Sequence, residues 1–190
     1  MGKATASLKR SLLWFSVGFG AVLAGALLLL FSGRIDVSAT RPHRAFTAWL
    51  FETARERSVQ YRASRITVPD DLEEAARFRR GAVHYAAMCA TCHGAPGREP
   101  DELAAGMMPK PPRLAETAHR WSPAELYVIV RDGVRMTGMP AWGVTHEESE
   151  LWNIVAFVRA LPQLTPQAYT MVTTATEDHH HDHHDQVHVH

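Results

Sequence analysis

The sequence predicts an all-α protein, in which a small helical domain follows one N-terminal helix long enough to cross a membrane. Apolar residues recur at helical spacing through residues 70–165, no segment alternates like a half-buried strand, and an uncharged apolar run lies near the N-terminus. The length of 190 residues allows one ordinary domain with appendages. We therefore expect an anchor over 1–33, a basic linker over 34–69, a helical domain over 70–165 and a disordered tail over 166–190.

The anchor prediction depends on 23 residues without a formal charge between Arg10 and Arg34. As a helix this run would be roughly 34 Å long, at about 1.5 Å per residue, which is enough to cross a bilayer. A cleaved signal peptide, with Val37-Ser38-Ala39 as its cleavage site, is the alternative, although the run is longer than a usual signal-peptide core. Loop charge does not settle the orientation, because basic residues flank the run on both sides.

The linker is the most basic part of the chain. Residues 1–69 contain ten Lys and Arg against three Asp and Glu, whereas the whole chain has no net charge. Apolar residues fall at helical spacing in it: Phe46, Trp49 and Leu50. Four arginines would be available to lipid phosphates: Arg44, Arg55, Arg57 and Arg62. An interfacial helix and a partly ordered spacer are both open interpretations. Nucleic acid is not an expected partner, because these residues form no basic recognition helix.

Three helices are expected within residues 70–165. The first has an apolar face at helical spacing, formed by Phe78, Ala82, Tyr85 and Cys89. The second begins at Ser122 with a capping box to Glu125 and ends at Gly133, and the third begins at a capping box of Thr145 and Glu148 and ends before Pro162. Residues 94–121 are rich in Gly and Pro and should form a long ordered loop, which in a compact domain indicates that something is enclosed.

The strongest functional signal is Cys89-Ala90-Thr91-Cys92-His93, the C-x-x-C-H pattern of covalent haem attachment. Two thiols three residues apart can each add across one haem vinyl group, and the adjacent imidazole then reaches the iron from the same side. A thioredoxin-like use would need a βαβ context, and a zinc site would need further ligands. Cys89 and Cys92 are the only cysteines, so their use would leave no free thiol. We expect one haem c with His93 as an axial ligand.

A six-coordinate iron needs a second axial ligand, and Met139 is the predicted one. It lies 46 residues after His93 in a loop where Gly138 and Pro140 can hold its side chain inward. A thioether suits iron(II) and raises the reduction potential relative to two imidazoles. Met136 is the alternative ligand.

Four stretches together resemble the class I mono-haem cytochrome c family: YAAMCATCHGAPG, KPPRL, DGVRMTGMPAWG and ELWNIVAFVRALP. More narrowly, they are similar to membrane-anchored bacterial members related to the cytochrome subunits of haem-copper oxidases. The resemblance covers residues 70 to 165. It implies a compact fold in which the first and last helices cross, with Gly81 at the close approach and Tyr85 packed near Trp152 or Phe157.

The resemblance also implies a haem pocket. A proline carbonyl after the motif would accept a hydrogen bond from Nδ1 of His93, and Pro111 and Pro112 are both candidates. Three residues are candidate donors to the haem propionates: Arg113, Trp121 and Trp142. With both axial positions filled, reversible one-electron transfer is the expected role, without a catalytic acid, base or nucleophile.

A compartment and partners follow from the same resemblance. Haem is attached in this way outside the cytoplasm in bacteria, which would place residues 34–190 in the periplasm, anchored to the inner membrane. The expected partners are a terminal oxidase or another periplasmic or membrane reductase in a respiratory chain.

The tail, EDHHHDHHDQVHVH over residues 177–190, is the remaining motif. Seven histidines in it could bind Zn, Cu, Ni or Co: His179, His180, His181, His183, His184, His188 and His190. A solvated tail with incidental metal affinity is the alternative. Two other functions thus stay open beside electron transfer: a metal-binding or sensing protein that works through the tail, and a peroxidase or gas-binding enzyme with an open axial site. Electron transfer is favoured, because the haem motif, the methionine loop and the anchor all indicate it.

Overall fold

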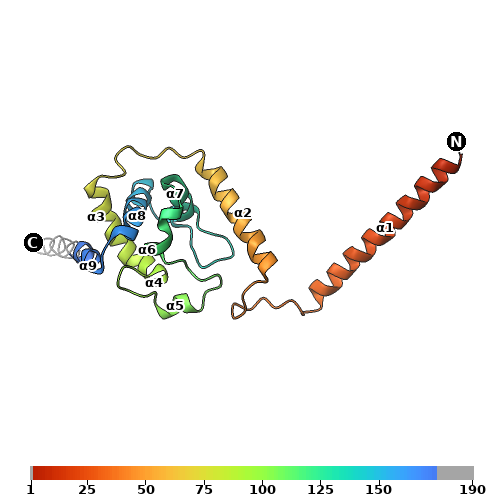
Figure 1. Ribbon diagram of the computed structural model, residues 1–190, viewed down its shortest axis with the longest axis horizontal. Helices are drawn as coiled ribbons and strands as arrows, with labels where there is room; N and C mark the ends of the chain where they lie inside the picture. The colour runs from red at the N-terminus through yellow and green to blue at the C-terminus, as the bar shows by residue number, and fades with distance from the viewer. Residues whose placement is uncertain (1, 175–190) are drawn as a thin grey trace, which may run out of the picture. The chain divides into compact units, whose positions relative to one another are not determined.

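The computed structural model describes residues 2–174, with side chains from residue 9 onward, and divides the chain into two compact units, Met1–Ser38 and Ala39–His190 (Figure 1). Within the described residues every regular element is a helix and none is a strand, so the all-α prediction is confirmed. The histidines of residues 179–190 lie outside the described residues.

The first unit contains one helix, α1 (Gly2–Phe31). Its segment Lys9–Phe31 is long and apolar enough to cross a membrane, and no other helix among the described residues passes this test. Side chains along the segment are exposed in the protein, for example Leu28 at 73% and Phe31 at 82%. An N-terminal signal sequence would have the same properties.

The second unit is built on α3 (Ala75–His84) and α8 (Glu148–Ala160), which cross at Gly81. A Cβ atom at Gly81 would lie 1.9 Å from the backbone oxygen of Asn153, so only glycine permits this approach. Next to it, the rings of Tyr85 and Phe157 lie 5.4 Å apart. The expected close approach and the Tyr85–Phe157 contact are both confirmed, whereas Trp152 stacks instead on Tyr127, with 4.2 Å between ring centroids.

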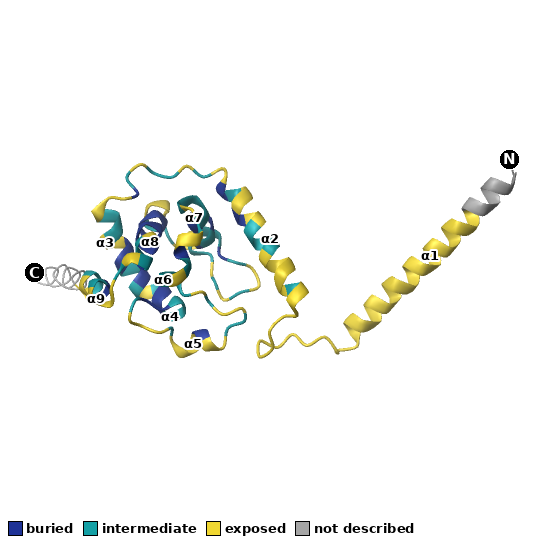
Figure 2. Ribbon diagram, in the orientation of Figure 1, coloured by how far each residue is buried: buried dark blue, intermediate teal, exposed yellow. Residues whose placement is uncertain are grey.

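The remaining elements surround this crossing. The longer ones are α2 (Ala45–Ala63), α7 (Pro123–Asp132) and α9 (Pro166–Thr174). The shorter ones are η1 (Tyr85–Cys89, a π-helical turn), α4 (Ala90–His93), α5 (Glu102–Ala105), α6 (Leu114–Thr117), η2 (Ala118–Arg120), η3 (Trp142–Val144) and η4 (Leu161–Gln163). Figure 2 shows buried residues concentrated on α8, α7 and the helix from α3 to α4.

Helix starts follow the predicted caps in one case and not in the other. Ser122 caps α7: its hydroxyl accepts a hydrogen bond from the Glu125 N–H, and Glu125 accepts one from the Ser122 N–H at 2.7 Å. The capping box predicted at Thr145 and Glu148 is wrong; it lies two residues later, at Glu147 and Glu150. The N–H of Thr145 already donates to the carbonyl of Trp142, the first residue of η3.

Two predicted irregular segments contain helix. Residues 94–121 do not form one continuous loop, because α5, α6 and η2 lie within them. The tail expected to be disordered from residue 166 begins with α9, where Tyr169 is 7% exposed and packs against the core. The hydroxyl of Thr165 accepts a hydrogen bond from the Ala168 N–H, and Pro166 occupies the first helical position, which explains where α9 begins.

The linker forms a helix, α2, whose C-terminal half packs against the domain. Val59 and Ala63 are buried against Val128 of α7. Two of the four arginines predicted to face lipid instead contact the domain: Arg62 pairs with Asp132, and the guanidinium of Arg55 lies 5.9 Å from the centre of the Trp121 ring.

Candidate haem site

The attachment motif lies where the helix from α3 through η1 to α4 ends. Cys89 closes η1 and is 8% exposed, while Cys92 is half-buried in α4, and neither forms a disulfide. Gly94 ends the helix at φ 66°, where an added Cβ would lie 2.8 Å from the Arg98 oxygen. The hydroxyl of Tyr85 donates to the Gly94 carbonyl at 2.6 Å. This contact between the core and the end of the helix holds the motif in place, and no local sequence signal indicates it.

The environment of Cys89 argues against a redox-active thiolate. Burial, followed by the proximity of Cys92, raises the pKa of the Cys89 thiol to about 12. Cysteines that act as nucleophiles or in disulfide exchange have a lowered pKa instead. A thioether has no ionisable proton, so covalent attachment of a vinyl group suits a buried sulfur at this position.

His93 is oriented by a single hydrogen bond. Its Nδ1 lies 2.7 Å from the carbonyl oxygen of Pro112, so Nδ1 carries the proton and donates it, and Nε2 keeps its lone pair. Partial burial lowers the pKa of His93, while the bond to Pro112 opposes that shift. A neutral imidazole with a fixed ring and a free Nε2 is the form that ligates a metal. Of the two candidate prolines, Pro112 is the one in contact; Pro111 is half-buried beside it.

Hydrogen bonds within the loop fix the backbone around Met139. The Val134 N–H donates to the Met139 carbonyl at 3.2 Å, and the Met139 N–H donates to the Thr137 hydroxyl at 3.1 Å. That hydroxyl donates in turn to the Val134 carbonyl at 2.7 Å. Gly133 has a φ of 64°, and a Cβ atom added to it would lie 2.8 Å from the Met139 carbonyl oxygen. Met107 lies against the exposed Gly138, and its sulfur would be 2.7 Å from a Cβ atom added there.

The two candidate methionines differ in exposure. Met139 is half-buried, whereas Met136 is 77% exposed, with a positive φ of 61°. A thioether ligand must reach iron inside the domain. The backbone that points Met136 outward therefore favours Met139.

The propionate candidates lie in different surroundings. Arg113 is held by two carboxylates, those of Glu99 and Glu116, and the side chain of Glu99 has a lowered pKa because Arg113 donates to it. Trp121 lies under the guanidinium of Arg55 at the edge of the core. Trp142 begins η3 and meets the ring of His146 edge-on at 5.4 Å. The structure thus gives each of these residues a protein partner.

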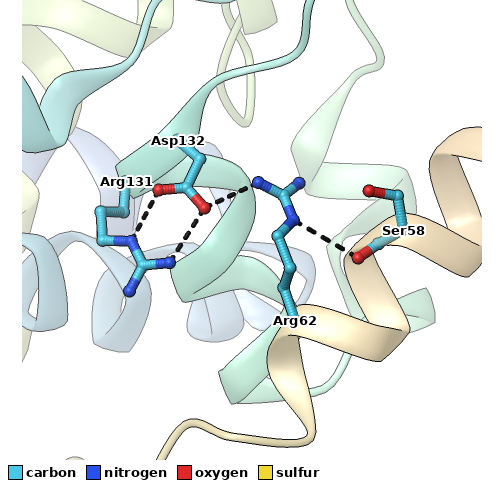
Figure 3. Close-up of polar contacts among 4 residues, drawn as sticks. All are labelled: Ser58, Arg62, Arg131 and Asp132. Atoms are coloured by element: carbon cyan, nitrogen blue, oxygen red, sulfur yellow. Dashed lines mark hydrogen bonds and ion pairs between the residues drawn. The ribbon is translucent and has the colours of Figure 1, made fainter.

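A charged cluster joins α2 to the start of the methionine loop. Figure 3 shows Asp132 between two arginines: Arg131 donates to it at 2.7 and 2.9 Å, and Arg62 at 2.7 Å. The hydrogen bonds from Arg131, and then the charge of Arg62, hold the pKa of Asp132 below its ordinary value. Since Asp132 directly precedes Gly133, the cluster fixes the first residue of the loop. Sequence reasoning missed it, because Arg62 and Asp132 are 70 residues apart.

The residues present fit a covalently attached haem. Two thiols, one of them buried and un-ionised, lie beside an imidazole whose Nε2 is free, and a separate hydrogen-bonded loop carries a half-buried thioether. No cluster of three or more His, Cys, Asp or Glu side chains able to hold a metal ion occurs in the part of the chain that the structure describes. This donor set matches c-type haem ligation and does not match a zinc site.

Comparison with known proteins points to the same group. Residues 76–158 match the family model of cytochrome c oxidase, cbb3-type, subunit III. No curated protein matches the chain. The matched range begins in α3 and ends in α8, so it includes the attachment motif, Pro112 and the methionine loop. Such a domain is an electron-transfer module rather than a catalytic one. Residues 76–158 therefore form a class I c-type cytochrome domain related to the subunits of haem-copper oxidases.

Proposed function

We propose that this chain is a membrane-anchored cytochrome that transfers single electrons at the outer face of a bacterial inner membrane, with His93 and Met139 as axial ligands. The domain class implies haem-based electron transfer. The observation that supports the ligand assignment best is the 2.7 Å contact between His93 Nδ1 and the Pro112 carbonyl, next to both cysteines.

Each residue has a separate task. Haem c, when bound, supplies a one-electron iron couple. Cys89 and Cys92 hold the group covalently, and His93 presents Nε2 because its Nδ1 proton is committed to Pro112. Met139 would supply a thioether as the second ligand, which would leave the bound group no free site for oxygen or peroxide. Since neither axial ligand gains or loses a proton in this arrangement, the chain's contribution is to hold the ligands still during electron transfer.

A pair of methionine variants tests the ligand assignment. Full-length protein should give the pyridine haemochrome spectrum of haem c and a low-spin ferric spectrum with the methionine-to-iron charge-transfer band. Met139→Ala should lose that band and lower the reduction potential, because a thioether favours iron(II). Met136→Ala is the matched control and should keep both, because Met136 is 77% exposed. Loss of the band in the control alone, or a high-spin spectrum in the wild type, would contradict the assignment.

The proposed topology places the N-terminus inside and residues 34–190 in the periplasm. Support comes from α1, which is long and apolar enough to cross a membrane, and from the c-type domain class. Protease added to intact spheroplasts should digest the haem domain, and the intact mass of the membrane-bound protein should include residues 1–39. Protection of the domain would contradict the topology, and a mature protein starting at Thr40 would indicate a cleaved signal peptide.

The redox partner and the tail are finer parts of the proposal. The matching family is a subunit of an oxidase, which supports association with a haem-copper oxidase or another membrane redox complex. Membranes that contain such an oxidase should reoxidise the reduced protein. The seven tail histidines are proposed to bind a transition metal through neutral imidazoles. Equal zinc or nickel binding by the full chain and by a variant with all seven replaced by Asn would refute this.

A further inference from the structure

Helix α2 has two faces with different surroundings. On one face, Val59 is 2% exposed and Ala63 8% exposed, and both pack against Val128 of the haem domain. The ion pair between Arg62 and Asp132, at 2.7 Å, adds a polar contact on the same side. The domain covers this face at its C-terminal end, and Figure 2 shows that the buried residues of α2 are confined to its C-terminal half.

The other face carries large side chains that are exposed; of these, Tyr61 contacts Arg65 of the segment that follows α2, whose guanidinium lies 4.7 Å from the centre of its ring. Phe46 is 70% exposed, Trp49 60%, Leu50 46% and Tyr61 64%. At about 100° per residue, Leu50 and Tyr61 fall within about 60° of Phe46, whereas Val59, nine residues after Leu50, lies about 180° round the helix from it. The rings of Phe46 and Trp49 lie 5.9 Å apart, so they form one continuous surface. We call these four residues the aromatic face.

Charge accompanies the aromatic face. Residues 34–69 contain seven arginines and three acids. Arg55 and Arg62 already contact the domain or a neighbouring residue of α2. The arginines available to lipid phosphates are therefore the exposed ones on the side of α2 that carries the aromatic face. Arg57 lies on the same line as Leu50 and Tyr61, is exposed, and has no ion pair among residues 9–174. Arg44, directly before the helix, is exposed as well.

Tryptophan, tyrosine and phenylalanine beside arginine are the combination that favours the headgroup region of a bilayer. The apolar segment of α1 ends at Phe31, and α2 begins at Ala45. The 13 residues between them can extend over at most about 45 Å, so an inserted α1 would keep α2 near the lipid surface. We propose that the aromatic face of α2 lies in the headgroup region of an anionic bilayer while its opposite face holds the haem domain. This inference depends on α1 being a retained anchor, as proposed above.

The consequence is that α2 sets the orientation of the haem domain on the membrane. A flexible spacer would let the domain tumble at the end of its tether. A helix that is packed on the domain along one side and embedded along the other leaves the domain one preferred face toward the lipid. The anionic headgroups would add attraction to Arg44 and Arg57 that weakens as salt rises.

Quenching of tryptophan fluorescence tests the proposal in the full-length haem protein, placed singly in nanodiscs of phosphatidylcholine and phosphatidylglycerol. One set of nanodiscs contains lipid brominated near the headgroup end of the acyl chain. The Trp14→Phe variant removes the tryptophan of α1. In that background, brominated lipid should reduce emission, and the additional change Trp49→Phe should abolish the reduction. Phosphatidylcholine alone should give weaker quenching than the anionic mixture.

The controls separate this inference from the anchor itself. Trp14 in the Trp49→Phe protein reports whether α1 is inserted; if brominated lipid does not quench it, the anchor proposal fails. Quenching of Trp14 without quenching of Trp49 would overturn only the aromatic-face proposal. If Trp14 is quenched and Trp49 is not, and two chains in detergent can be cross-linked at position 49, the aromatic face binds a second copy of this chain instead of lipid. The double variant Phe46→Ser, Leu50→Ser should reduce the quenching of Trp49. Met171→Ser on α9 is the control and should leave it unchanged, because Met171 is as exposed as Phe46, at 70%, but lies outside the aromatic face.

Discussion

Replacing Gly81 with alanine tests the crossing of α3 and α8, on which the position of the attachment motif depends. The added methyl group would lie 1.9 Å from the Asn153 oxygen, 2.6 Å from the Asn153 carbonyl carbon and 2.8 Å from the Phe157 Cβ. Two of these atoms are backbone, so no change of rotamer relieves the overlap, and the helices must separate. Overpacking costs up to about 3 kcal/mol. Alanine regains about 1 kcal/mol of helix propensity over glycine, which leaves a net loss of about 2 kcal/mol.

The free energy of unfolding can be measured by urea denaturation of the haem-loaded variants, followed by far-ultraviolet circular dichroism. A loss of about 2 kcal/mol should lower Tm by roughly 8 to 16 °C in a domain of this size. Gly106→Ala is the matched control: its nearest neighbour would be 3.9 Å away and its φ is −86°, so the substitution should be neutral or slightly stabilising. If Gly81→Ala is as stable as the wild type, the close crossing is not required and the reasoning is refuted.

Two further predictions concern charge. Arg62→Gln should lower the free energy of unfolding by about 1 kcal/mol at pH 7, because the ion pair with Asp132 is partly screened, while Arg57→Gln should change nothing. Since the pKa of Asp132 is lowered in the folded protein, the Arg62 effect should be complete above about pH 4 and decline only as the pH falls below that, through the lowered pKa of the folded state; an effect that does not decline anywhere in acid would contradict the pairing. Burial lowers the pKa of His84, with Glu150 opposing and His146 assisting that shift, so stability should fall as the pH drops below about 6.5. His84→Gln should flatten that part of the curve of unfolding free energy against pH, and an unchanged slope would show that His84 is not the group responsible.

Local signals in the sequence predicted most of the longer helices. The Ser122 capping box and the glycine at position 133 mark both ends of α7, and each depends on residues within a few positions of one another. The predicted cap of α8 was wrong because Thr145 and Glu147 both have side chains suited to a cap. Only the preceding turn, η3, decides between the two positions. A similar local signal, Thr165-Pro166, marks the start of α9, although the sequence that follows it is polar.

Apart from the crossing at Gly81 and the Tyr85–Phe157 contact, which the family resemblance implied, contacts between distant residues could not be predicted. The choice between Pro111 and Pro112 depends on the path of the backbone opposite His93, which no periodicity encodes. The pair Arg62 and Asp132 joins the linker to the methionine loop across 70 residues of sequence. The sequence therefore indicated the chemistry of the site through a short motif, while the contacts that orient its members emerged only from the fold.

The π-helical turn η1 determines which way the attachment motif faces. The Ala90 N–H donates to the Tyr85 carbonyl five residues back, so this turn contains one residue more than an α-helical turn. The buried side of α3 accordingly continues after Tyr85 at Ala90, which is 0% exposed, and Cys89 next to it is buried as well, at 8%. The turn thus accommodates one extra residue between Tyr85 and Ala90 while Ala90 stays on the buried side. Deleting Ala86 or Ala87 would put Ala90 four residues after Tyr85, the spacing of an ordinary α-helical turn, so Cys92 and His93 would keep their angular setting.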